Sequence, residues 1–95
     1  MTRGNVRPEK VSKPETRHAP MFMVLLHNDD ISTMDHVVAA LMTTFHFEVP
    51  KAVEIMREAH LKGVALCETL PLEQAEFRKE MLQSLSLTAT IEPEG

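Results

Sequence analysis

Apolar and polar positions along the chain predict a strand followed by a helix after residue 20. Residues 21–26 form a short, almost continuously apolar run, and the polar residues 27–30 follow it. This pattern is typical of a buried strand that ends in a loop. From Met34 to Phe45 the apolar residues recur on one helical face, and a capping box from Ser32 to Asp35 predicts that Ser32 caps this helix.

The rest of the chain continues the alternation between helical and strand patterns. The predicted elements are a helix at 50–62, a strand at 64–68, a helix at 71–85 and a strand at 85–91. Pro50 suits the first turn of the first of these helices, and Gly63 suits its left-handed end. Its inward-facing side chains are expected to be Ala52, Val53, Met56, Ala59 and His60. The order β-α-α-β-α-β predicts an α+β fold, a small three-stranded antiparallel sheet with three helices on one face.

The chain divides into one folded domain and two short ends. Its 95 residues leave room for a single domain. Residues 1–20 contain three prolines and almost no apolar side chains, which predicts a flexible N-terminal extension. The folded domain is expected over 21–92, with a C-terminal tail at 93–95.

Charge and composition exclude several classes of protein. Residues 1–19 carry a net charge of +3 and residues 20–95 a net charge of −7, and an acidic body argues against binding to nucleic acid. The longest uncharged apolar run, 21–26, is too short to cross a membrane. The first residues show no apolar core of a secretory signal, and the one cysteine, Cys67, can form neither an intramolecular disulfide nor a multi-cysteine zinc site. We therefore expect a cytoplasmic protein.

The first candidate site is the sequence Asn28-Asp29-Asp30 in the predicted loop. These residue types are common in turns, because their side chains cap nearby backbone groups. Two carboxylates beside an amide could also receive an ammonium group or a metal ion. Both interpretations stand at this point.

His60 and the methionines offer two further candidates. His60 shares the apolar stripe of its helix, where a histidine is most often an interior residue. A neutral imidazole could instead complete a three-point grip on an ammonium group together with Asn28 and one aspartate. Met34 and Met56 are typical core residues, yet beside Val37 they could line a shallow pocket for a bulky apolar side chain. Together these groups would suit an amine that carries a hydrophobic side chain.

Catalysis and metal binding have weaker support. Cys67 and His60 could form a thiol and base pair, but Cys67 lies in an apolar run where a buried small residue is expected. Glycine-rich phosphate loops, nucleophile elbows and paired zinc histidines are absent from the sequence. His27, His36 and His46 have no recognised ligand spacing. We predict no catalytic residues, no metal site and no cofactor.

Two sequence blocks, taken in order, are more specific than any single motif. Residues 24–38 read V-L-L-H-N-D-D-I-S-T-M-D-H-V-V, and residues 52–63 follow the spacing A-x-x-x-M-x-x-A-H-x-x-G. They resemble the ClpS family, whose patterns read roughly V-x-L-x-N-D-D-x-T-P-M-E-F-V and A-x-x-x-M-x-x-x-H-x-x-G. The resemblance covers about residues 21–92. It implies a non-catalytic adaptor of the N-end rule, which binds substrates through an N-terminal Leu, Phe, Tyr or Trp and delivers them to a Clp unfoldase of the AAA+ class.

The resemblance also implies a role for individual residues. The group around the substrate's α-ammonium would be Asn28, Asp29, Asp30 and His60, with Asp29 nearer the following peptide unit. The side-chain pocket would be lined by Ser32, Met34, Val37, Met56 and Leu87, with Met34 excluding β-branched residues. Glu73 and Arg78 would lie on the surface that faces the unfoldase, which would be ClpA-like or ClpC-like, and the N-terminal extension would engage its pore.

Departures from the family pattern mark a divergent member. They are Ile31 for a tyrosine, Ser32 for a threonine, Thr33 for a proline and His36 for a phenylalanine. The connection between the third helix and Leu87 is also about six residues short, which predicts a shallow pocket that prefers Leu or Phe to Trp. Two alternatives to the adaptor are an interaction module without amine recognition, such as the similar C-terminal domain of the ribosomal stalk protein, and a small metal- or thiol-dependent enzyme.

Overall fold

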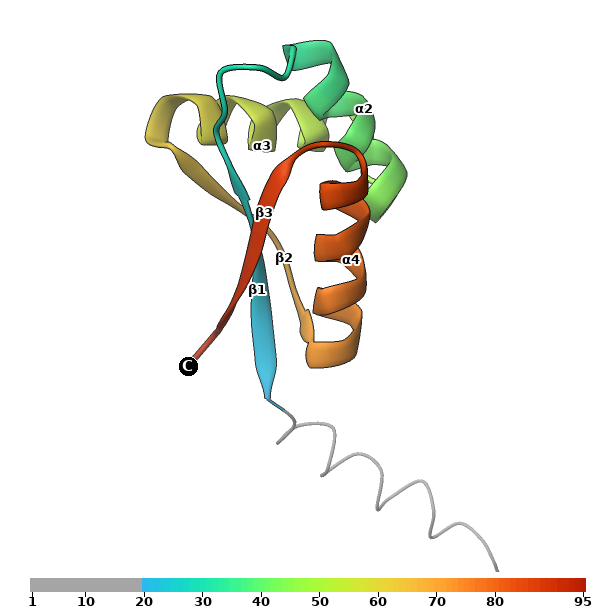
Figure 1. The fold of residues 1–95 in the computed structure, drawn as a ribbon, viewed down its shortest axis with the longest axis vertical. Helices are drawn as coiled ribbons and strands as arrows, with labels where there is room; N and C mark the ends of the chain where they lie inside the picture. The colour runs from blue at the N-terminus through green and yellow to red at the C-terminus, as the bar shows by residue number, and fades with distance from the viewer. Residues whose placement is uncertain (1–19) are drawn as a thin grey trace, which may run out of the picture.

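The computed structural model describes residues 20–95, which form a three-stranded antiparallel sheet and three helices (Figure 1). The elements are β1 (Met21–His27), α2 (Met34–Phe45), α3 (Val49–Lys62), β2 (Val64–Pro71), α4 (Leu72–Ser84) and β3 (Thr88–Pro93). The predicted order of elements and the α+β class are confirmed. The predicted extension, apart from Pro20, lies outside the described residues. No helix among residues 20–95 is long and apolar enough to cross a membrane.

β1 is the central strand, in the sheet order β2-β1-β3, and both of its neighbours run antiparallel to it. Its inward side chains Val24 and Leu26 are almost completely buried, as the apolar run predicted. β2 carries one extra residue, Cys67, between the partners of Val24 and Leu25. β3 continues through Pro93, so the sheet extends into the segment that was expected to be a tail.

The core lies between one face of the sheet and the helices. α4 packs against all three strands, whereas α3 packs against β2 and α2 packs against the other two helices. Figure 1 shows α4 running beside the sheet and α2 and α3 gathered at one end of it. The largest fully buried side chains are Leu26, Leu41, Leu82, Val24 and Thr44. This arrangement leaves the β1–α2 loop at the end of the sheet where α2 and α3 meet.

The start of α2 differs from the prediction by one residue. Thr33, not Ser32, is the cap: its backbone is extended, and its Oγ1 accepts a hydrogen bond from the His36 N–H at 3.1 Å. Ser32 is excluded from this role because Asp29 holds it within the loop, at 3.1 Å between Ser32 Oγ and Asp29 Oδ2. The shift leaves the predicted helical face intact, because Leu41 and Phe45 remain buried.

α3 ends as predicted, and its inward face differs from the prediction at Ile55 and His60. Gly63 adopts a φ of 91°, and its N–H donates to Ala59 O at 2.9 Å, so the glycine stop is confirmed. Ile55 is buried and was missing from the expected stripe. The expectation that His60 faces inward was wrong, because it is exposed at the last turn. Ala52 and Ala59 are buried as predicted, and Val53 and Met56 are half-buried.

The last predicted strand was placed too early. Leu85 and Ser86 form a turn after α4, and β3 begins only at Thr88. Ser86 has a φ of 69°, a left-handed conformation that reverses the chain direction. Leu87 follows and is buried, with its N–H donating to Leu82 O at 3.0 Å. The turn therefore aims Leu87 inward before the strand starts.

Candidate functional site

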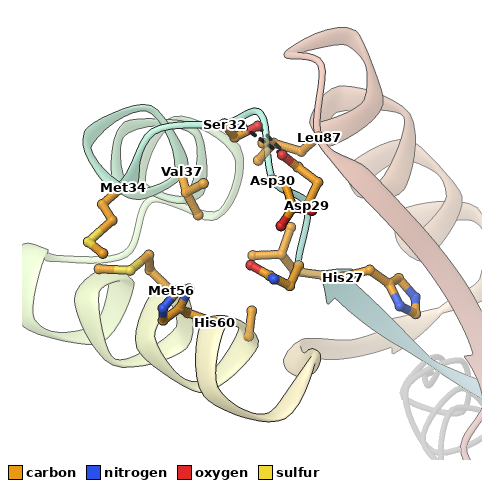
Figure 2. Close-up of a pocket in the computed structure, with 12 residues that line it drawn as sticks. His27, Asp29, Asp30, Ser32, Met34, Val37, Met56, His60 and Leu87 are labelled. Carbon is orange, nitrogen blue, oxygen red and sulfur yellow. Dashed lines mark hydrogen bonds between the residues drawn. The ribbon is translucent and has the colours of Figure 1, made fainter.

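A cavity of about 220 Å³ opens where the β1–α2 loop meets α2, α3 and the turn before β3 (Figure 2). It is lined by Leu26, His27, Asn28, Asp29, Asp30, Ser32, Met34, Val37, Met56, Ala59, His60 and Leu87. All nine residues predicted to hold the substrate's amine or side chain lie in this lining. The sequence motifs therefore converge on one place although they come from four separate segments.

Asp29 holds the loop in shape. Its Oδ1 accepts hydrogen bonds from the N–H groups of Ile31 at 2.8 Å and Ser32 at 2.7 Å. The N–H of Ser32 is the largest cause of a pKa of the Asp29 carboxyl below its usual value, followed by the N–H of Ile31. Both carboxylate oxygens of Asp29 thus have partners within the loop. The interpretation of these residues as a turn therefore holds for Asp29.

Asn28 and Asp30 present their side chains to the cavity. The backbone N–H of Asn28 donates to Gly63 O at 2.9 Å, which ties the loop to the end of α3. Both residues are exposed and line the cavity. An amide oxygen and a carboxylate at this position are acceptors that suit a primary ammonium group.

His60 completes this polar group from the opposite side. It lies in the last turn of α3, is exposed, and lines the same cavity as Asn28 and Asp30. In Figure 2 its imidazole lies beside the side chain of Met56. The interpretation of His60 as an interior residue is therefore wrong, and the position that the helix gives it is one at which an imidazole nitrogen can reach a ligand.

The remaining wall of the cavity is apolar. Met34 and Val37 come from α2 and Met56 from α3, and their side chains face one another across the opening in Figure 2. Met34 is 57% exposed, so the cavity has a flexible apolar rim. Sequence reasoning missed Leu26, His27 and Ala59 as lining residues. Leu26 and Ala59 have the pattern of core residues, and a hydrophobic pattern does not distinguish a core residue from the floor of a pocket.

Leu87 is fixed in the wall by a contact that the sequence did not suggest. The ring Nε2–H of His36 donates to Leu85 O at 2.6 Å, because a carbonyl oxygen can only accept. This bond joins the first turn of α2 to the turn before β3. His36, which departs from the family pattern, therefore holds the segment that carries Leu87.

Comparison with known proteins shows which family this chain belongs to. The sequence model of the family described as "ATP-dependent Clp protease adaptor protein ClpS" matches residues 17–90. The chain belongs to the ClpS family. It is 46% identical over 91 residues to the ClpS adapter protein of Synechococcus elongatus, covering 90% of this chain and 96% of that protein. It is 47% identical over 76 residues to ClpS of Gloeobacter violaceus, covering 79% of this chain and 82% of the relative.

A solved ClpS structure shares the fold. The structure of Agrobacterium tumefaciens ClpS2 bound to L-phenylalaninamide superposes with a TM-score of 0.77 at 26% identity, covering 81% of this chain and all of that one. As a member of this family, the protein is an adaptor of the ATP-dependent Clp protease and not an enzyme.

The thiol of this ClpS protein has no catalytic setting. Cys67 is buried on β2, as its apolar run predicted. Burial, and next the charge of Glu68, raises the pKa of the thiol to about 12, so it stays protonated at neutral pH.

His27 lines the cavity and its Nε2 lies 2.8 Å from Thr90 Oγ1. Among residues 20–95, no three histidine, cysteine or acidic side chains gather as they would around a metal ion.

The two residues expected to face the unfoldase lie on α4, outside the cavity. Glu73 is exposed in the first turn. Arg78 is half-buried and donates from Nη1 to Thr44 O at 3.0 Å, which links α4 to α2. Its guanidinium also lies 5.4 Å from the ring centroid of the exposed Phe77. Arg78 thus has a structural contact in addition to any role in docking.

Proposed function

We propose that this ClpS protein recognises the N-terminal residue of its substrates, with Leu or Phe preferred, and delivers them to a Clp unfoldase. The observation that carries this proposal is the meeting of three exposed polar side chains, Asn28, Asp30 and His60, with an apolar wall in one cavity. The polar groups suit an α-ammonium, and the wall suits a bulky side chain. The phenylalaninamide in the related ClpS2 structure has both parts.

Asp30 rather than Asp29 is proposed as the carboxylate that contacts the ammonium. The oxygens of Asp29 already accept hydrogen bonds from Ile31 and Ser32. Asp29 would act by keeping Asn28 and Asp30 in place, near the first peptide unit of the substrate. Asp30 would therefore bind the ammonium group, whereas Asp29 would position the loop.

The expected affinity follows from these contacts. Burying a leucine or phenylalanine side chain contributes roughly 1.5–3 kcal/mol, and each hydrogen bond to a charged group about 1.5–3 kcal/mol more. The ordering of the peptide and the loss of its free motion cancel several kcal/mol of this favourable binding energy. A net free energy near −8 kcal/mol corresponds to a Kd of about 1 μM, which suits an adaptor that must release its cargo.

The back wall of the cavity is the basis of the proposed preference for Leu or Phe over Trp. Leu87 closes the back wall and is held by the turn before β3, so the wall cannot easily retreat. A Trp-initiated peptide that binds more tightly than Leu and Phe peptides would contradict this preference.

Docking to the unfoldase is proposed to use the exposed side of α4 with Glu73, and Arg78 at its edge. The partner would be ClpA-like or ClpC-like. The protein would act in the cytoplasm, because Cys67 is a buried, free cysteine and the cytoplasm is a reducing compartment. The basic residues 1–19 would engage the unfoldase pore.

A degradation assay tests the complete proposal. Reporter proteins that begin with Phe, Leu or Met are incubated with ATP, the peptidase and either a ClpA-type or a ClpC-type unfoldase. We expect this protein to accelerate the loss of the Phe and Leu reporters with one of the unfoldases and to leave the Met reporter unchanged. Glu73→Lys should abolish the acceleration while leaving peptide binding intact, whereas equal degradation of all three reporters would contradict N-terminal recognition.

A further inference from the structure

His36 lies where the first turn of α2 meets the turn before β3. Its ring Nε2–H donates to Leu85 O at 2.6 Å. The next residue along α2, Val37, lines the cavity, and so does Leu87 from the turn (Figure 2). The side chain of His36 is itself exposed and does not line the cavity. Any effect of His36 on binding must therefore act through the two walls that its hydrogen bond joins.

The other hydrogen bonds of this turn fix its shape but not its distance from α2. The N–H groups of Leu85 and Leu87 each donate to Leu82 O at 3.0 Å, so they join the turn to α4. Within the part of the chain that the structure describes, the bond from His36 is the one hydrogen bond that joins this turn to α2. The position of Leu87 relative to the α2 wall of the cavity therefore depends on this bond.

α2 is also tied to α4 at a second place, farther from the cavity. Arg78 Nη1 donates to Thr44 O at 3.0 Å, in the last turn of α2. Loss of the His36 bond would leave this second tie and the buried core between the helices in place. Only the end of α4 beside the cavity would then be free to move away from α2, and Leu87 would move with it.

We propose that His36 is a positioning residue that sets the specificity of the cavity: its bond to Leu85 holds Leu87 close to α2 and so limits the size of the first substrate residue. The inference rests on the proposed function, because it needs the side chain of that residue to reach Leu87. The phenylalanine of the family pattern at this position could not replace the bond, because its side chain has no polar hydrogen to donate.

The test is fluorescence anisotropy with peptides that begin with Leu, Phe or Trp, applied to the unaltered protein and to His36→Ala. We expect His36→Ala to weaken binding of the Leu peptide but not of the Trp peptide. The ratio of Trp to Leu affinity should rise about fivefold, a change that one hydrogen bond can supply. Because His36 is exposed, the variant should fold, and thermal unfolding checks this.

His36→Gln separates the hydrogen bond from the charge of the ring. The pKa of the Asp29 carboxyl is lowered first by the N–H of Ser32 and then by that of Ile31, and least by the charge of His36. A glutamine amide nitrogen lies as many bonds from Cα as the imidazole Nε2 does, so it can donate to Leu85 O without carrying a charge. We expect His36→Gln to keep the original ratio of Trp to Leu affinity. A ratio like that of His36→Ala would overturn the role of the bond.

Thr43→Ala is the matched control, because Thr43 is exposed on the same helix and does not line the cavity. It should leave the ratio unchanged. An unchanged ratio in His36→Ala, or an equal loss for all three peptides as a purely structural role would give, would overturn the inference while N-terminal recognition stands. Acetylated peptides separate the two claims: if acetylation changes nothing, or if no peptide binds the unaltered protein, both are overturned.

Discussion

His60 is the residue whose loss should weaken peptide binding most cleanly. It is exposed at the end of α3, so His60→Ala removes a ligand contact without leaving a hole in the core. We expect a loss of peptide affinity of about 10-fold or more, as for one hydrogen bond to a charged group, with no change in the midpoint of thermal unfolding. Lys51→Ala is the control, because this exposed side chain lies in the first turn of α3. Equal affinity in His60→Ala would remove His60 from the ammonium site.

Asp29 is proposed to stabilise the loop rather than to contact the ligand, and the pH dependence of stability tests its role in the loop. Its folded pKa is lowered by N–H donors, so it stabilises the fold above its usual pKa of 3.8, and this contribution is lost as the pH falls through the lowered value. We expect Asp29→Asn to reduce the free energy of unfolding by about 1 kcal/mol at pH 7, and by progressively less as the pH falls below 3.8. Urea unfolding across this range measures the difference. A deficit that is constant down to pH 2 would contradict this role.

Sequence reasoning named residues that line one cavity, but its expectation for the burial of His60 was wrong. The stripe on α3 placed His60 inward, because a period of 3.6 residues leaves a neighbouring position almost indistinguishable from the true face. Side-chain hydrogen bonds decide the roles of Asp29 and Asp30, and identical residue types in a row carry no signal that separates them. Residue chemistry suggested one site for an amine and its apolar side chain, and the family resemblance added Ser32 and Leu87 and gave each residue an expected role.

At the scale of elements, the position of Cys67 on β2 predicts that its thiol reacts slowly in the folded protein. Cys67 is buried and its thiol pKa is raised to about 12, so native protein at pH 8 should react with a disulfide reagent only through unfolding. We expect the reaction to be at least about 100-fold slower than in urea, since only opened molecules expose the thiolate. Cys67→Ala should retain peptide binding. Rapid modification of the native protein would contradict the burial of this strand face.

The order and type of the elements were predictable, but several boundaries were not. Strong local signals such as Gly63 placed the end of α3 correctly. The start of β3 was placed too early, because Leu85 and Leu87 continue the alternation of the strand while Ser86 turns the chain with a positive φ. A leucine in a tight turn before a strand has the same pattern as one within it. Only the hydrogen bonds of the turn distinguish the two.

At the scale of the whole molecule, the cavity exists because three distant segments of the chain meet. The loop after β1, the end of α3 and the turn before β3 come together at one end of the sheet (Figure 1). The sheet order β2-β1-β3 makes this possible, because the central strand delivers its loop between the two helices and the last turn. Hydrophobic patterns predict elements but not which strand is central, so this convergence could not be derived from periodicity. It is the property of the molecule on which the proposed function rests.

The central claim is that the cavity binds a free α-ammonium together with the side chain beside it. The most direct test is fluorescence anisotropy with peptides that begin with Leu, Phe, Trp or Ala, each with a free or an acetylated N-terminus. We predict that free Leu and Phe peptides bind with a Kd of about 1 μM and that Trp and Ala peptides bind more weakly. Acetylation should abolish binding, because it removes the charge that Asn28, Asp30 and His60 are proposed to hold. Equal binding of free and acetylated peptides, or binding of none, would contradict the account.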